Sequence, residues 1–314
     1  MIIAEELREL TITPGSAPAY LSAASGLVCA RSWIYVVADD EHHLGVFRKD
    51  SHGPGDVFRL VGGELPSAPK ARKKQKPDFE VLLRLPAFGG YQDGALLAMA
   101  SGSRPNRQAG VIIGLDSTGA LRGEPKQVDL SFIFGPLGRS FAALNVEGAV
   151  ALGAELHVFQ RGNKKNSANA VIRFSLAAFL EALGSKAPAP LEALAIRTYD
   201  LGHIKGVPLC FTDAAALSHG DIVFSAVAED TDDTYNDGLS AGSAVGLLGA
   251  DGACRWLRRL NHPFKIEGLD VRRDGEYLHI LMVTDADDRG VPAKMLAGKT
   301  PYSRESGTMN SDRK

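Results

Sequence analysis

Acidic residues recur at comparable places along this chain, and they are the side chains best able to do chemistry. Each lies in the first strand-like run of a repeat and precedes a small or apolar residue. Ser25 stands at the corresponding place nearest the N-terminus, and the acids are Glu80, Glu147, Asp213 and Glu267. Carboxylates brought together in this way would repel one another by about 1–4 kcal/mol per close pair at a surface-like dielectric. The pattern therefore predicts a compensating positive charge.

Two sources of that positive charge stay open at this level. A hard divalent cation takes about six to eight oxygen ligands. Glu80, Glu147, Asp213 and Glu267 would partly supply them, and calcium is the first metal to consider. Alternatively, the acids pair with basic residues that are near them in sequence or lie in matching loops: Lys76, Lys265, Arg107 and Arg161.

A second polar set lies in the loop that follows the second strand of each repeat. These loops mix acids with arginine and lysine, and they cover residues 39–40, 101–107, 161–165, 229–233 and 285–288. All would lie on one face, so we expect Asp39 and Asp40 to join the basic residues in binding a small charged, for example phosphorylated, ligand. The alternative is that Asp, Asn, Ser and Gly merely form turns there.

The elements that must position these residues are short strands. Residues 265–284 contain a strand, an Asp-Gly turn and a more apolar strand, followed by an acidic loop. Looser copies recur at intervals somewhat longer than the roughly 20–50 residues typical of repeat arrays, and each copy holds about four strand-like runs. The predicted fold class is all-β, a β-propeller of five four-stranded blades, with six blades as the alternative count. A β-sandwich is the competing fold for so many short strands.

The last repeat lacks a fourth strand, and the N-terminal run 7–12 is predicted to supply it. We expect one propeller domain over residues 1–300 and a polar tail over 301–314. A helical insertion is predicted at about 175–184, with Ser175 as its N-cap. The basic run 70–76 is predicted to be a solvated loop between blades.

The composition argues against two classes of partner, nucleic acids and membranes. A formal net charge of -2 is not expected of a protein that binds nucleic acid. No apolar run approaches the roughly 18 residues of a membrane span. The three cysteines show no pairing pattern and are predicted to be free thiols in a reducing compartment. The N-terminus lacks the pattern of a signal peptide, so the expected location is the cytoplasm. No nucleotide cofactor is expected, because Ala293 occupies the first glycine position of a P-loop ending at Gly298-Lys-Thr300.

Short motifs carry a family resemblance. Glu147-Gly-Ala and Glu267-Gly-Leu, each followed by an apolar strand and a polar loop, resemble the repeat of esterase-like phytases and of strictosidine-synthase-like or gluconolactonase-like propellers. Over residues 25–296 the chain resembles more closely an uncharacterised bacterial family of cytoplasmic propellers. The motifs that carry this second resemblance are Asp39-Asp40, Lys76-Pro-Asp-Phe-Glu80, Phe211-Thr-Asp-Ala214 and Lys265-Ile-Glu-Gly268. In the wider group, the resemblance implies that inner-strand carboxylates hold a divalent cation, often calcium. Ser25 departs from that pattern, because an acid would be expected there.

The function predicted from these patterns is that of a soluble propeller which binds a small charged ligand, with a divalent cation, at the channel mouth. If it is an enzyme, the reaction to test is hydrolysis of an ester, lactone or phosphoester, in which the cation polarises the substrate or its attacking water. The alternative is a non-catalytic propeller that holds a protein partner on its face.

Overall fold

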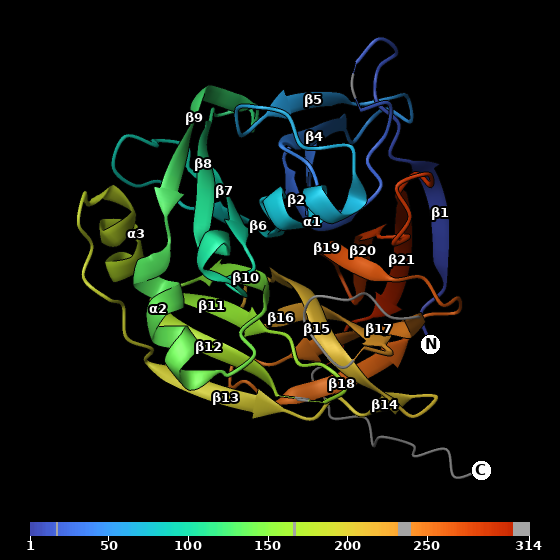
Figure 1. Cartoon of the computed structure of the whole chain (residues 1–314). Coiled ribbons are helices and arrows are strands. Elements are labelled where there is room, and N and C mark those ends of the chain that lie inside the picture. The colour runs from blue at the N-terminus through green and yellow to red at the C-terminus, as the bar shows by residue number, and fades with distance from the viewer. Residues whose placement is uncertain (17, 166–167, 232–239, 304–314) are drawn as a thin grey trace.

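Five sheets form a ring around a central channel (Figure 1). The computed structural model describes residues 1–16, 18–165, 168–231 and 240–303. The prediction of an all-β propeller with five blades is confirmed. The predicted rim loop 229–233 is described only as far as Thr231, and the predicted tail 301–314 only as far as Ser303; the rest of each lies outside the described residues.

The strands of each blade pair antiparallel. Blade 1 contains β2 (Ala24–Ala30), β3 (Trp33–Ala38), β4 (His43–Arg48) and β5 (Asp56–Arg59). Blade 2 contains β6 (Phe79–Leu85), β7 (Ala95–Ala100), β8 (Ala109–Leu115) and β9 (Leu121–Asp129). Blade 3 contains β10 (Val146–Leu152), β11 (Glu155–Gln160), β12 (Asn169–Ser175) and β13 (Ala195–Tyr199). Blade 4 contains the short β14 (His203–Ile204), then β15 (Val207–Ala216), β16 (Ile222–Glu229), β17 (Ser240–Leu248) and β18 (Cys254–Arg259). Blade 5 contains β19 (Ile266–Asp274), β20 (Tyr277–Thr284), β21 (Lys294–Pro301) and the N-terminal β1 (Ala4–Glu9).

The inner strands β2, β6, β10, β15 and β19 contact one another in a closed ring. Outward from them, the apolar faces of neighbouring blades meet in hydrophobic clusters. Among the described residues, one such cluster lies at each of the five blade interfaces. Burial between blades, rather than one central core, therefore holds the ring together.

The N-terminal strand closes the ring, as predicted. β1 pairs with β21 in the register Ala4↔Gly298. The predicted boundaries of 7–12 were wrong, because the strand ends at Glu9. The apolar residues Leu10 and Ile12 instead pack in the cluster between blades 5 and 1.

The described part of the chain also contains three α-helices outside the sheets. α3 (Leu176–Gly184) occupies the predicted insertion, and its N-cap Ser175 accepts a hydrogen bond from the Ala178 N–H. The prediction of a loop at 70–76 was wrong. α1 (Pro69–Gln75) forms there, and its proline stands at a position that favours helix starts. α2 (Ser131–Ser140) was not predicted, and its apolar residues join the cluster between blades 2 and 3. No helix among the described residues is long and apolar enough to cross a membrane.

A β-bulge interrupts the inner strand of every blade, near the start of the strand in four blades and in the middle of β15 in blade 4. In each case one residue is skipped in the pairing with the second strand, and these residues are Ser25, Glu80, Glu147, Thr212 and Glu267. A bulge re-aims a side chain at the edge of a sheet. The five bulges therefore place five matched side chains around one end of the channel.

Glycine follows the bulge in three blades, where the inner strands approach closely. A Cβ on Gly26 would lie 2.8 Å from the backbone nitrogen of Leu82 in blade 2. A Cβ on Gly148 would lie 3.1 Å from the Cα atom of Asp213 in blade 4. These glycines let neighbouring blades meet backbone to backbone.

Gly26→Ala is expected to lower the free energy of unfolding by about 1–3 kcal/mol, because the added methyl group forces two inner strands apart. Urea denaturation followed by circular dichroism measures this. Gly135→Ala is the control, because a Cβ on Gly135 meets no atom within 4 Å and the residue lies in α2. Alanine favours a helix over glycine by up to about 1 kcal/mol. A Gly26→Ala protein as stable as wild type would contradict the close-approach argument.

Candidate functional site

Three matched positions line the end of the channel where the bulges lie. The first is the bulge itself. The second lies two residues earlier, on the same side of the strand, and holds Ala23, Asp78, Asn145, Cys210 and Lys265. The third follows the second strand, and in four blades its N–H donates to the carbonyl of the second position: Asp39 to Ala23, Ser101 to Asp78, Arg161 to Asn145 and Asp285 to Lys265. The same three backbone positions thus recur from blade to blade, but the residues that occupy them differ.

A small polar cavity lies within this frame. Its volume is about 70 Å³, and twelve of its lining side chains carry a charge: Asp39, Lys73, Lys76, Asp78, Glu80, Arg107, Glu147, Arg161, Glu229, Lys265, Glu267 and Asp285. Seven of these side chains are acidic and five are basic. The space suits a hydrated ion or a small polar molecule. The cavity therefore has an excess of carboxylates over cations.

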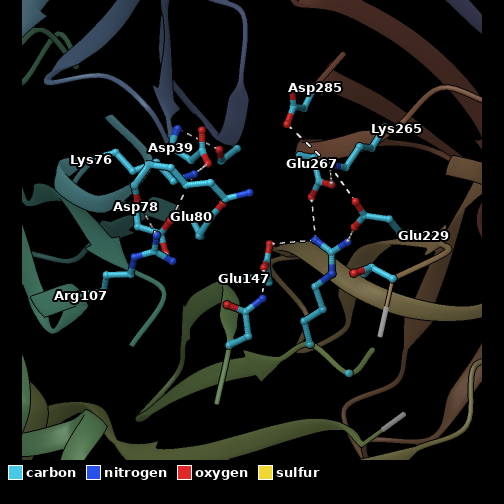
Figure 2. Close-up of a pocket in the computed structure, with 16 residues that line it drawn as sticks. Asp39, Lys76, Asp78, Glu80, Arg107, Glu147, Glu229, Lys265, Glu267 and Asp285 are labelled. Carbon is cyan, nitrogen blue, oxygen red and sulfur yellow. Dashed lines mark hydrogen bonds and ion pairs between the residues drawn. The ribbon is translucent and has the colours of Figure 1, made fainter. Parts of the chain in front are cut away.

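One side of the cavity is formed by Asp39, Lys76, Asp78, Glu80 and Arg107, here called the blade 1–2 group (Figure 2). The ammonium of Lys76 forms ion pairs with Asp39 and, at 3.3 Å, with Asp78. The Arg107 guanidinium lies 2.9 Å from the same Asp78 carboxylate. Asp78 also accepts a hydrogen bond of 2.5 Å from the Ser101 hydroxyl. Asp78 is thus fully occupied by neighbouring donors.

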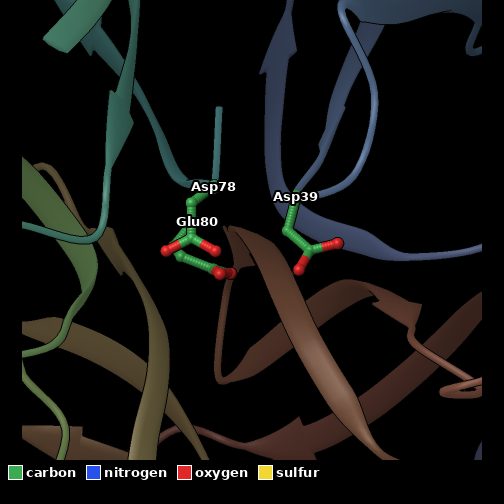
Figure 3. Close-up of side chains that lie close together, drawn as sticks. All are labelled: Asp39, Asp78 and Glu80. Atoms are coloured by element: carbon green, nitrogen blue, oxygen red, sulfur yellow. The ribbon is translucent and has the colours of Figure 1, made fainter. Parts of the chain in front are cut away.

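Glu80 differs from its neighbours. Within the described part of the chain, no hydrogen bond or ion pair to its carboxylate is found, although the side chain lines the cavity. Carboxylate oxygens of Asp39, Asp78 and Glu80 lie within 4.8 Å of one another (Figure 3). Burial, followed by the charge of Asp78, raises the pKa of Glu80 to about 8. A carboxyl group in this setting holds a proton or calls for a cation.

The opposite side is formed by Glu147, Arg161, Glu229, Lys265 and Glu267, here called the blade 3–5 group. Arg161 lies at its centre and forms ion pairs with Glu147 at 3.3 Å, with Glu267 at 3.5 Å and with Glu229. Figure 2 shows the labelled acids of this group facing the blade 1–2 group across the cavity. All five residues are buried. Burial raises the pKa values of Glu147 and Glu267, so one guanidinium does not fully compensate its carboxylates.

Lys265 extends this group toward the rim. Its ammonium lies 3.4 Å from Glu229, 3.6 Å from Glu267 and 2.5 Å from Asp287. The Oε1 atom of Glu267 is buried and accepts no hydrogen bond from any described residue. The Lys265 Nζ lies 3.6 Å from this oxygen. The cavity thus contains a buried carboxylate oxygen with unused capacity to accept.

Asp213 does not lie at the mouth, contrary to the prediction. Thr212 occupies the bulge of blade 4, and its hydroxyl hydrogen bonds to the Ile266 carbonyl at 2.7 Å. The Asp213 carboxylate is buried and accepts hydrogen bonds of 2.8 Å from the N–H groups of Ala214 and Leu269. Burial raises its pKa well above the ordinary value. Asp213 therefore ties the inner strands of blades 4 and 5 together within the ring.

Asp40 is also placed elsewhere. Its carboxylate pairs with Arg72 of α1 at 3.3 Å and with Arg289 at 3.0 Å, and it lines a neighbouring cavity rather than the mouth. Alternation along the chain turns Asp39 toward the channel and Asp40 toward the helix. This Asp40 cluster anchors α1 against blade 1.

The other predicted site residues converge at the mouth. Glu80, Glu147 and Glu267 line the cavity together with the basic residues and Asp39: Lys76, Lys265, Arg107, Arg161 and Asp39. One acid of the cavity, Asp78, was missed. The signal for Asp78 is its place two residues before Glu80. Glu229 and Asp285 also line the cavity, and each is the first residue of a predicted rim loop, 229–233 and 285–288.

Solved structures share the overall shape over nearly the whole chain. An α-L-arabinofuranosidase from Podospora anserina in complex with cellotriose is 9% identical, with a TM-score of 0.48 and coverage of 96% of this chain and 97% of that one. A glucose dehydrogenase is 12% identical, with a TM-score of 0.46 and coverage of 96% and 99%. A luciferin-regenerating enzyme is 7% identical, with a TM-score of 0.43 and coverage of 96% of each chain. At these scores the likeness is too distant to inform the chemistry of the site.

Comparison with curated proteins finds no match. A protein-family model, in contrast, matches residues 20–299, which span all five blades and both groups of the channel mouth. The chain therefore belongs to the family of unknown function DUF6929.

Proposed function

We propose that the channel mouth binds a divalent cation together with a small anionic ligand. The carrying observation is Glu80, whose carboxylate has no partner within the described residues and lies with those of Asp39 and Asp78 within reach of one ion. Seven acids against five bases line the cavity, so a cation would relieve repulsion that the protein leaves uncompensated.

A second feature of the cavity supports the same ligand. The Oε1 atom of Glu267 is buried without a hydrogen bond and lines the cavity from the opposite side. Every candidate ligand atom among the described residues is an oxygen, since none of the described residues that line the cavity is a histidine or a cysteine. Oxygen-only donor sets suit calcium and magnesium, and calcium tolerates irregular geometry better. Calcium is therefore the first ion to test.

Binding of the cation would also prepare a site for an anion. Lys76 now contacts both Asp39 and Asp78, and a divalent ion on those carboxylates would take its place. The released ammonium, with Arg107 beside it, would then attract a negatively charged substrate. The ligand class that follows is a small anion such as a carboxylate or a phosphoester.

Hydrolysis is the reaction that best suits this arrangement. A bound divalent cation polarises a carbonyl or phosphoryl oxygen and lowers the pKa of its water. Glu267, whose Oε1 atom accepts no hydrogen bond from any described residue, would accept the proton of that water. The oxygen of that water would bond to the carbonyl carbon or phosphorus, the bond from that atom to the alcohol oxygen would break, and the carboxyl group would return its proton to the alcohol oxygen. Esters, lactones and phosphoesters are the substrates to screen.

Isothermal titration with calcium, magnesium and manganese chlorides tests the proposal. We expect one ion to bind with a stoichiometry of one, and Glu80→Gln to weaken it about tenfold or more, because the substitution removes a charge and keeps the shape. The matched control is Glu124→Gln, an exposed carboxylate on β9. A wild-type protein that binds none of the three ions would overturn the cation site.

Turnover separates catalysis from binding. A panel of esters, lactones and phosphoesters should show hydrolysis by the cation-loaded protein, reduced about a hundredfold or more in Glu80→Gln. Cation binding without any turnover would leave a ligand-binding propeller. Turnover that is unchanged in Glu80→Gln would remove this residue from the chemistry. If the protein neither binds a cation nor turns over any substrate, the alternative of a protein-binding scaffold would be favoured.

A further inference from the structure

A second cavity lies at the seam where the ring closes, between blade 1 and blade 5. Its volume is about 300 Å³, and it is lined by residues of β1, β19, β20 and β21 on one side and of β2, β3 and β4 on the other. This size lies at the lower end of the range for small-molecule sites, about 300–1,000 Å³. None of its lining residues belongs to the channel-mouth cavity.

The inner part of the seam cavity is apolar. Ile34, Ile280 and Met295 line it and are at most 4% exposed, and Leu281 and Ala297 add further apolar surface. Covering such surface with hydrocarbon stabilises a complex by removing it from water. The inner part therefore suits the apolar body of a ligand.

The outer part carries positive charge, to which Arg8 and Lys49 contribute, although the charge of Lys49 also acts on the Asp270 carboxylate. The Arg8 guanidinium donates to the carbonyl oxygens of Ser51 at 2.8 Å and Gly53 at 3.0 Å, and it lies 4.9 Å from the centroid of the Phe47 ring. These contacts hold its position without neutralising its charge. Lys49 makes no ion pair with a described residue.

Two other arginines of the rim are already paired. Arg48 forms an ion pair with Asp50 at 2.9 Å and Arg272 with Asp274 at 3.6 Å. Asp270 is the one acid among the residues that line the seam cavity, and its Oδ2 accepts a hydrogen bond of 2.7 Å from the Cys29 N–H. The uncompensated charge of the rim is therefore positive.

We propose that the seam cavity binds a small molecule with one anionic head on an apolar body. The head would lie between Arg8 and Lys49, and the body would cover Ile34, Leu281 and Met295. The ligand would contact β1 and blade 1 at once, so its binding would also stabilise the closure of the ring. This site does not depend on a cation at the channel mouth.

Three probes separate the two parts of the proposed ligand. Octanoate combines an anionic head with an apolar body, octylammonium carries the same body with the opposite charge, and acetate has the head alone. Titration calorimetry below the micelle concentration should show octanoate binding about tenfold or more tightly than either control. Equal binding of octanoate and octylammonium, or no octanoate binding up to about 1 mM, would overturn the proposal.

Two substitutions test the location. Lys49→Glu reverses the charge at an exposed position, and Ala297→Phe places a ring in the apolar part. Each should weaken octanoate binding about tenfold or more, while circular dichroism melting verifies that the protein is folded. Lys186→Glu, exposed after α3, is the matched control and should bind as wild type. Glu80→Gln should also leave octanoate binding unchanged. If the two seam variants fold and still bind octanoate like wild type, the ligand does not occupy this cavity.

Discussion

Arg161→Met should lower the free energy of unfolding by about 3–5 kcal/mol at neutral pH, the usual cost of removing one partner from a buried ionic cluster. The guanidinium contacts Glu147, Glu229 and Glu267, all of which are buried. Methionine fills much of the same volume, so the loss reflects charge more than packing. Urea denaturation at about pH 7.5 measures the effect.

The loss in Arg161→Met should shrink as the pH falls toward about 5. Folding already raises the pKa values of Glu147 and Glu267 in the wild type through burial, and removal of Arg161 raises them further. A group with a raised folded pKa contributes stability that is fully present below its unfolded pKa and is lost as the pH rises through the folded one. Protonation at low pH therefore relieves the repulsion that the variant exposes.

Arg139→Met is the control for this experiment. Arg139 lies on α2 and forms an exposed ion pair with Glu192 at 3.6 Å. Exposed pairs contribute about 0–1 kcal/mol, so the control should be nearly as stable as wild type. If Arg161→Met loses no more than this control, Arg161 is not needed to compensate the carboxylates of the blade 3–5 group.

Calcium binding should tighten about 50-fold between about pH 6 and pH 8 and level off above about pH 9. Burial raises the pKa of Glu80 to about 8. Below that value a cation must displace the proton of Glu80, and each pH unit weakens binding about tenfold. Titration calorimetry at unit pH intervals measures this slope.

Glu80→Gln removes the titrating group, so the residual affinity of this variant should change little with pH. In the absence of a cation, the raised pKa of Glu80 contributes stability that is present below its ordinary value of 4.5 and lost as the pH rises through about 8. Calcium should restore that stability at high pH. At a concentration of 100 times the dissociation constant, the gain is about 2.7 kcal/mol. A wild-type affinity that stays constant from pH 6 to pH 8 would show that Glu80 is not a ligand.

Much of the site was predictable from the chain because strand geometry is local. Glu80, Glu147 and Glu267 each follow an apolar residue and open a strand, and in each blade a β-bulge turns this residue toward the channel. Asp213 precedes a small residue, as Glu147 and Glu267 do, but Thr212 occupies the bulge. A shift of one residue changes the direction of a side chain in a strand. Because Asp213 lies one residue after the bulge, its carboxylate points into the ring, where it accepts hydrogen bonds from the backbone, and not toward the channel mouth.

The placement of other residues could not be predicted because it depends on the length and docking of whole elements. Glu229 was predicted to begin a rim loop, but it is the last residue of β16 and lines the cavity from the end of that strand. Asp40 is adjacent to a residue of the mouth, yet Arg72 of the unpredicted α1 binds it. A local pattern contains neither the extension of a distant strand nor the docking of a helix.

The amino-acid sequence by itself determined the all-β class, the five repeats and the recurrence of acids at the start of inner strands. These properties follow from alternation of side chains and from turn residues, which act over a few positions. Only the tertiary structure decided which charges pair. Arg161 meets Glu267 from 106 positions away, and Lys294 of β21 meets Glu6 of β1 from 288. Ion pairing and desolvation depend on distances that exist only once the ring has closed.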